Sequence, residues 1–244
     1  MTHTPIASIL AAVRSVPVPP SPIPKAYAPP PAPFVTISRE PGAGAIDVGR
    51  AFVDAMNQDA LEDQAWTCWE RELVEKVAAD HHLSTRLIEE LEENNHSWIS
   101  SFFSSLSFTD SVAHDEDAIY HKVKRTIEAL ASAGRVVIIG RGGVFITRHL
   151  RGGIHLRLVA PFKDRVAFIA EKMHLTERAA GMQIREWERH RRQFFKMHWP
   201  HETVDPEHFA VTINTAEVQH EQIVQMLRGL VRQRIAAASV ALGK

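Results

Sequence analysis

Short apolar runs alternate with longer amphipathic stretches along most of this chain. Each run has the length of a buried β-strand. The five runs lie at 34–37, 65–68, 135–140, 154–159 and 209–213. After the first run, Val48, Phe52 and Met56 recur at helical spacing. Strands that alternate with helices are typical of a mostly parallel sheet wrapped by helices, so the pattern predicts an α/β fold with right-handed crossovers.

Residues at helix ends add detail to this prediction. Pro161 suits a first helical turn, and apolar residues at helical spacing follow it. Asn214 and Thr215 are capping candidates for a final helix that would close one face of the sheet. The interval 69–134 contains no convincing strand and is predicted to be a helical insertion. Its aromatic stretch at 98–108 suits either a packed helix or an apolar wall beside a ligand.

The first part of the chain has a different composition. Nine of the 14 prolines fall between residues 17 and 33, where they favour extended polyproline II conformation. We therefore predict a disordered proline-rich tail over 1–33, one domain over 34–236 and a short C-terminal tail over 237–244. The apolar residues near the start could dock on a protein partner or on the domain, or could belong to a frayed terminus.

Charge and cysteine content narrow the classes of partner. The chain carries 28 Lys and Arg against 29 Asp and Glu, so it has no global basic field to attract nucleic acid or anionic lipid. Cys68 is the only cysteine, which excludes an internal disulfide and fits a reducing compartment. No apolar run approaches the roughly 18 residues that span a bilayer, and we expect no membrane anchor or signal. The expected location is cytoplasmic.

A glycine turn joins the first predicted strand to the helix that follows. In such a turn backbone amides can converge on phosphate, and the helix N-terminus favours an anion. The candidate phosphate-binding residues are Gly42, Ala43, Gly44, Ala45, Ile46 and Asp47. The complete phosphate-loop signature needs a lysine and a hydroxyl where this chain has Ala45 and Asp47. A glycine turn without a ligand is the alternative.

Arginines flank this loop and follow two other strands. Arg39 precedes the turn, and Arg50 lies one helical turn past Asp47. Arg141 follows the third strand, at the edge of a parallel sheet where ligands bind, and its guanidinium suits a phosphate or the polar edge of a base. Arg71 follows the second strand and could hold a monophosphate or pair with a glutamate along its helix.

Basic residues also concentrate in one late helical segment. Residues 185–196 hold five Lys and Arg and two acids, a charge of 5 − 2 = +3 in a chain of net −1. Helical spacing places three arginines on one face, where they could close over a polyphosphate or form an exposed face paired with glutamates. These three are Arg185, Arg189 and Arg192. Histidines at 198, 201 and 208 lack the spacing of a metal site, so we predict no metal held by a protein cluster.

Taken together, these segments resemble the cytidylate kinase-like family of P-loop nucleoside monophosphate kinases. The matching pieces, in order, are Val35–Gly44, the stretch from Glu70, Val137–Gly142, residues 156–166, the arginine-rich segment before Phe194, and 209–215. The resemblance implies a P-loop NTPase fold with a parallel five-stranded sheet of order 2-3-1-4-5, helices on both faces and a helical insertion. Residues 69–134 would form the monophosphate-binding side and 176–200 the lid.

The resemblance also implies a reaction and residue roles. The γ-phosphoryl group of ATP would pass to a nucleoside monophosphate such as CMP or dCMP, with Mg²⁺ as cofactor. The glycine loop would cradle the ATP phosphates, and Arg141 and Arg71 would meet the monophosphate. The arginines that would stabilise the moving phosphoryl group are Arg185, Arg189 and Arg191.

The phosphate loop departs from the family pattern. Cytidylate kinases keep the loop lysine, and the kinase-like branch commonly reads GSGGREIG where this chain reads GAGAIDVG. An acid at position 47 would repel phosphate unless Mg²⁺ lies between them. Two interpretations stay open: an active kinase, or a degenerate P-loop protein that binds nucleotide or a protein partner without phosphoryl transfer.

Overall fold

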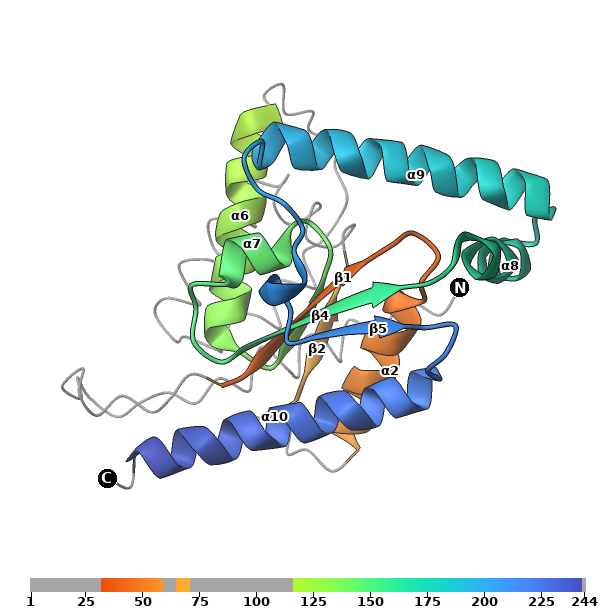
Figure 1. Ribbon diagram of the computed structural model, residues 1–244. Helices are drawn as coiled ribbons and strands as arrows, with labels where there is room; N and C mark the ends of the chain where they lie inside the picture. Colours follow the sequence, from red (N-terminus) through yellow and green to blue (C-terminus); the bar gives the residue numbers. More distant parts are fainter. Residues whose placement is uncertain (1–31, 59–64, 71–115, 243–244) are drawn as a thin grey trace, which may run out of the picture.

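A five-stranded parallel sheet forms the centre of the computed structural model, which describes residues 32–58, 65–70 and 116–242. Its strands are β1 (Phe34–Arg39), β2 (Thr67–Trp69), β3 (Val136–Ile139), β4 (Gly153–Val159) and β5 (Val211–Asn214). Their order in the sheet is β2-β3-β1-β4-β5, and every neighbouring pair is parallel (Figure 1). The α/β fold and the strand order expected from the sequence are both confirmed.

The central strand β1 is buried on both faces from Phe34 to Ile37 because helices cover it on both sides. Val35 and Ile37 are fully buried and pair in register with Val137 and Ile139 of β3. On its other edge β1 pairs with β4 along its whole length, from Phe34 to Arg39. The glycine turn after β1 therefore begins at the carboxyl edge of the sheet, between the neighbouring strands β3 and β4.

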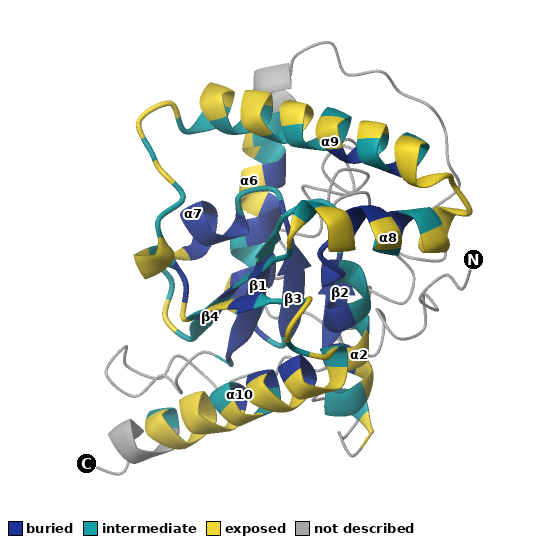
Figure 2. Cartoon of the chain, turned by 45° about the vertical axis from the view of Figure 1, so that its right-hand side comes forward, coloured by how far each residue is buried: buried dark blue, intermediate teal, exposed yellow. Residues whose placement is uncertain are grey.

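Helices flank the sheet on both faces and cross one of its edges. They are α2 (Ala45–Asn57), α6 (Glu116–Ala133), α7 (Gly143–Thr147), α8 (Phe162–Met173), α9 (Glu177–His198), the 3₁₀ turn η3 (Pro206–His208) and α10 (His220–Leu242). Helices α2 and α10 pack together on one face, and α6 and α7 lie on the other (Figure 1). Figure 2 shows the buried strands enclosed between these layers, with the exposed helix faces turned outward.

Two helix starts differ from the sequence prediction. Pro161 is the residue before α8 rather than its first residue. Helix α10 begins at His220, so Asn214 and Thr215 do not cap it. The Thr215 amide instead donates to the Val159 carbonyl, 2.9 Å away, which continues the β4–β5 pairing. The Asn214 side chain accepts from the Ala216 amide at 3.1 Å and forms a local turn, a common alternative use of asparagine.

Helix α9 runs across the carboxyl edge of the sheet and is anchored at both ends (Figure 1). Thr176 caps its start by accepting from the Ala179 amide. Near that start, Ala180 and Ile184 are fully buried against α8. At its other end, Trp199 packs against Phe145 of α7. The middle of α9 therefore lies above the point where the strands end.

Some sequence predictions concern segments outside the described residues. These are the proline-rich tail up to residue 31, Arg71 and the aromatic stretch at 98–108. Of the predicted insertion, the structure describes α6 and the end of β2. No helix in the described part of the chain is long and apolar enough to cross a membrane.

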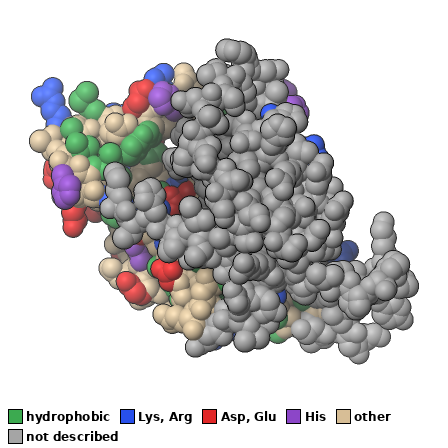
Figure 3. Space-filling view, turned by 180° about the vertical axis from the view of Figure 1, so that it is seen from behind, with side chains coloured by type: hydrophobic (Ala, Val, Ile, Leu, Met, Phe, Trp, Pro, Cys, Tyr) green, Lys and Arg blue, Asp and Glu red, His purple; other side chains and the backbone are tan. Residues whose placement is uncertain are grey.

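An exposed corner of the molecule, formed by α8 and α9, carries hydrophobic side chains, as the view from behind shows (Figure 3). Met173, Leu175 and Met182 are exposed on these two helices and the turn between them.

A polar pair lies within the central strands. Thr36 of β1 and His155 of β4 are register partners, and the Thr36 hydroxyl lies 2.8 Å from Nδ1 of His155. Burial lowers the pKa of His155 to about 4, and the positive charge of Arg234 on α10 acts in the same direction. The folded state therefore holds this histidine neutral.

We expect this histidine to make stability depend on pH. Unfolded His155 takes up a proton near pH 6.5, whereas the folded form does so near pH 4. Between these values the unfolded state binds more protons, so the free energy of unfolding should fall as pH drops from 6.5 to 4, by about 3 kcal/mol in total. Urea unfolding at several pH values in this range would measure the free energy of unfolding. This free energy should depend less steeply on pH for His155→Gln than for the wild type. Equal pH dependence of the two proteins would contradict the low pKa assigned to His155.

Candidate functional site

The glycine loop after β1 has the backbone geometry of a tight turn into a helix. Gly42 and Gly44 both have positive φ, at 88° and 72°, and Gly44 is the N-cap of α2. A Cβ atom on Gly42 would lie only 2.9 Å from the Cβ of Arg165 on α8. Glycine is therefore required at both positions, and the amide groups of the first turn of α2 face the sheet edge.

Arg165 fixes this loop to α8 and α9. Its guanidinium donates to the carbonyl oxygens of Ala160 at 2.9 Å and Pro41 at 3.2 Å, and to the Glu188 carboxylate at 2.8 Å. The side chain is only 6% exposed. Sequence reasoning did not select this residue, although an arginine within the apolar stripe of α8, between Phe162 and Val166, was a usable signal.

Glu40 adds a second connection between the loop and the end of β4. Its carboxylate accepts from the Ala160 amide at 3.2 Å and lies 3.5 Å from Nε of Arg165. Its own amide donates to the Leu158 carbonyl. The loop is thus held by neighbours on β4, α8 and α9 before any ligand binds.

Three arginines, here called the arginine cluster, gather at the carboxyl edge of the sheet: Arg39 of β1, Arg157 of β4 and Arg191 of α9. Arg191 donates to the backbone carbonyl of Arg39. Burial, followed by the charges of Arg39 and Arg157, lowers the pKa of Arg191 to about 10, while Glu40 and Glu188 act in the opposite direction. A partly buried group of like charges is a favourable place for an anion.

Arg141 lies at the same edge, after β3. The preceding Gly140 has positive φ, and a side chain at that position would collide with the guanidinium of Arg39. Arg141 itself has φ 50° and places its guanidinium 4.8 Å from the centre of the Phe194 ring on α9. The ends of β1 and β3 and the second half of α9 therefore meet here.

The other arginines of the basic segment lie elsewhere on α9. Arg185 is exposed and stacks 4.9 Å from the ring centre of Phe162. Arg189 is exposed and is hydrogen-bonded to Glu186. This contact has the form of the alternative interpretation, an exposed basic face paired with glutamates. Arg192 is also exposed. Ala180 and Ile184 are buried against α8, and the same face of α9 carries Glu188 and Arg191, which therefore turn inward. Because the three other arginines lie on the opposite side of the helix, they point to solvent.

Side chains in the first two turns of α2 have partners on other elements. Both carboxylate oxygens of Asp47 contact Nζ of Lys172 on α8, at 2.5 and 2.6 Å. Arg50 pairs with Glu70 at the end of β2, with Nε 2.7 Å from the carboxylate, and so lies toward β2. Ala45 is buried in the core, and the loop itself carries no lysine.

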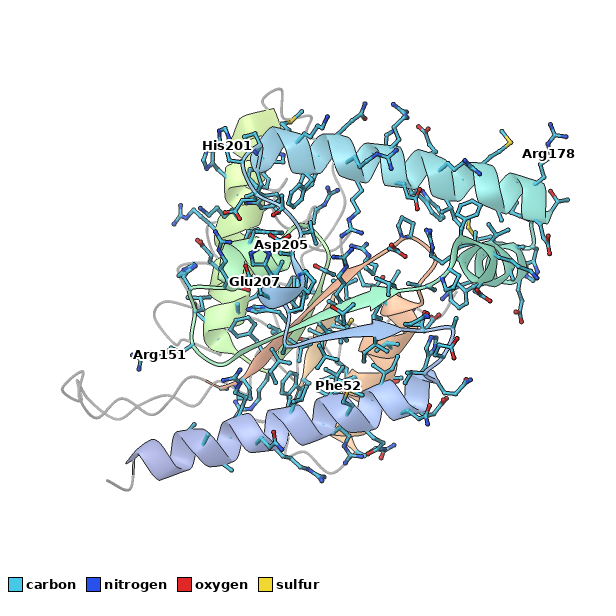
Figure 4. The ribbon with its side chains drawn as sticks, in the orientation of Figure 1. Phe52, Arg151, Arg178, His201, Asp205 and Glu207 are labelled. Carbon is cyan, nitrogen blue, oxygen red and sulfur yellow. The ribbon has the colours of Figure 1, made fainter. Side chains whose placement is uncertain are left out.

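The described residues contain no group of three or more His, Cys, Asp and Glu arranged to hold a metal ion. His198 stacks on Tyr120, and His208 accepts from the Asp205 amide. Figure 4 shows His201 at the end of α9, with Asp205 and Glu207 further along the segment that leads to β5. Magnesium bound to ATP needs only one or two protein carboxylates. Asp47 offers one in the first turn of α2, so the donor set fits a metal held mainly by phosphate oxygens and water.

The sheet order and the glycine loop at the start of α2 define a P-loop kinase-like protein. The sequence model of the cytidylate kinase-like family matches residues 34–217, and the chain belongs to this family. An uncharacterized protein from Eubacterium ventriosum shares the fold, with 15% identity and a TM-score of 0.57 over 83% of this chain and 99% of that one. Shikimate kinase from Bacteroides thetaiotaomicron aligns with a TM-score of 0.43 and 15% identity, over 82% and 98% of the two chains.

One curated protein shows a partial sequence match. It is named uronate isomerase, from Corynebacterium glutamicum, and is 28% identical over 101 residues. The match covers 41% of this chain and 19% of that protein, so the chain spans about a fifth of the length of this relative.

We predict that Arg165→Met lowers the free energy of unfolding by about 2–3 kcal/mol. The substitution leaves Glu188 and two carbonyl oxygens without their buried donor, while Glu40 and Glu188 keep partial access to water. Denaturant unfolding would measure the change. Arg189→Met, which removes an exposed pair on the neighbouring helix, is the matched control and should leave stability nearly unchanged. Equal stability of the two variants would refute the role given to Arg165.

Proposed function

We propose that this protein binds ATP at the glycine loop and transfers its γ-phosphoryl group to a nucleoside monophosphate, with CMP or dCMP as the first candidates. The observation that carries the proposal is the arginine cluster at the sheet edge, beside a glycine loop that opens a helix. Membership of the cytidylate kinase-like family supports the nucleotide as the anion. Parallel sheets of this type bind their ligands at this edge.

The residues at the sheet edge suggest how negative charge on the phosphates would be stabilised during transfer. In the transfer, a phosphate oxygen of the acceptor forms a bond to the γ-phosphorus as the bond to the leaving ADP oxygen breaks. Loop amides of residues 42–47 would hold the ATP phosphates. Arg191, with Arg39 and Arg157, would offset charge on the transferred group, and Arg141 would meet the acceptor. Magnesium bound to ATP would supply further positive charge, with Asp47 as its candidate protein ligand.

The wider assignments follow the same proposal. Residues 69–134, with Arg71, would form the acceptor side, and 176–200 would act as the lid that contains α9. Within the lid, Arg185 and Arg189 are exposed, so only a movement of α9 would bring them to the phosphates. The proline-rich residues 1–33 are a proposed contact for a protein partner, and the cytoplasm is the proposed location.

A second candidate function is nucleotide binding without phosphoryl transfer. The observation that favours it is the first turn of α2, where Ala45 is buried and Asp47 is paired with Lys172. A screen of common nucleoside monophosphates with ATP and Mg²⁺ separates the two functions. ADP release that depends on a monophosphate supports the kinase, whereas thermal stabilisation by nucleotide without turnover supports the binding protein.

We expect Arg191→Met to lower kcat/KM for phosphoryl transfer by about 10²- to 10³-fold, because it removes a partly buried, preorganised charge from the site. Arg178→Met is the control on the same helix, since Arg178 projects into solvent at the outer tip of α9 (Figure 4). Initial rates at varied acceptor concentration would provide the measurement, and thermal melts would confirm that both variants fold. A wild-type rate for Arg191→Met would contradict a role of the arginine cluster in the reaction.

A further inference from the structure

The phosphate loop contains no lysine, yet an ammonium group lies at the first turn of the helix that follows it. Nζ of Lys172 contacts both carboxylate oxygens of Asp47, at 2.5 and 2.6 Å. Asp47 is the third residue of α2, three positions after the N-cap Gly44. The ammonium therefore reaches the N-terminal end of α2 from a different helix, across 125 positions of the chain.

Helix α8 holds Lys172 in this place through contacts at both of its ends. In its first turn Arg165 packs against Gly42 and bonds to the Pro41 carbonyl. One turn before Lys172, the Phe168 ring centre lies 5.2 Å from Nζ. The same ring meets the edge of His220, whose Nε2 lies against Gly44. The lysine is thus part of a set of side chains that surrounds the start of α2.

The pair between Lys172 and Asp47 is accessible to a ligand. The two side chains are 45% and 36% exposed, so an incoming anion can reach the ammonium. An ion pair with this exposure contributes little to stability. A charged group beside backbone amides, by contrast, can strengthen the binding of phosphate considerably.

We propose that Lys172 is a phosphate-binding residue that supplies, from α8, the positive charge missing from position 45. In the absence of nucleotide, Asp47 holds the ammonium next to the loop. When phosphate binds, the ammonium contacts its oxygens. This inference rests on the proposed nucleotide site and deepens it.

ADP binding in the presence of EDTA tests the inference without a contribution from magnesium. Lys172→Met should weaken ADP binding by about 10- to 100-fold, as expected for the loss of a charge-assisted hydrogen bond. Lys172→Arg, which keeps the charge, should retain most of the affinity. Lys163→Met removes an exposed lysine from the first turn of the same helix and should bind ADP as the wild type does. Calorimetric titration would give the affinities.

Asp47→Asn separates this role from that of a surface ion pair. The substitution removes a negative charge near the phosphates and releases Lys172, so ADP affinity should stay equal or rise, while Lys172→Met lowers it. If both substitutions lower affinity equally, or if neither changes it, the inference is wrong and the nucleotide site stands. If the wild-type chain binds no nucleotide, the proposed function fails and this inference fails with it.

Discussion

Arg165 joins three parts of the molecule that lie far apart in the chain. Its guanidinium contacts the Pro41 carbonyl in the loop, the Ala160 carbonyl after β4 and the Glu188 carboxylate on α9. Because the side chain is buried, these bonds are shielded from water, and the loss of one leaves a polar group without a partner. Arg165 therefore fixes the glycine loop to α8 and α9, whose own packing rests on the apolar contacts of Ala180 and Ile184.

The same contacts determine the charge at the sheet edge. Glu40 and Glu188 lie close enough to raise the pKa of Arg191, but both carboxylates also contact Arg165. On the pKa of Arg191, Arg39 and Arg157 have a larger influence than these two glutamates. With Arg165 included, four arginines stand beside these two acids, so the carboxyl edge keeps a charge of 4 − 2 = +2. A polyanion would compensate that charge, which connects the packing of α9 to the proposed binding of nucleotide.

The sequence predicted the fold better than it predicted the site. Buried strands and their alternation with helices are local patterns, so all five strands could be located, and the resemblance supplied their order. Helical spacing placed Arg185, Arg189 and Arg192 on one face, but it could not say which face turns inward. That depends on the apolar contacts of Ala180 and Ile184 with α8. The pairing of Asp47 with Lys172 joins two helices and follows no local pattern.

A loop that lacks its lysine can still keep the geometry of a phosphate loop, because that geometry belongs to the backbone. The positive φ angles of Gly42 and Gly44 and the packing against Arg165 do not involve the side chain at position 45. Ala45 is buried and packs with the core under α2, so it is unavailable for contact with a ligand. In the proposed nucleotide site, positive charge for a phosphate would then come from outside the loop. The candidate groups belong to β1, β4, α8 and α9, and two of these elements, α8 and α9, are joined to the loop through Arg165.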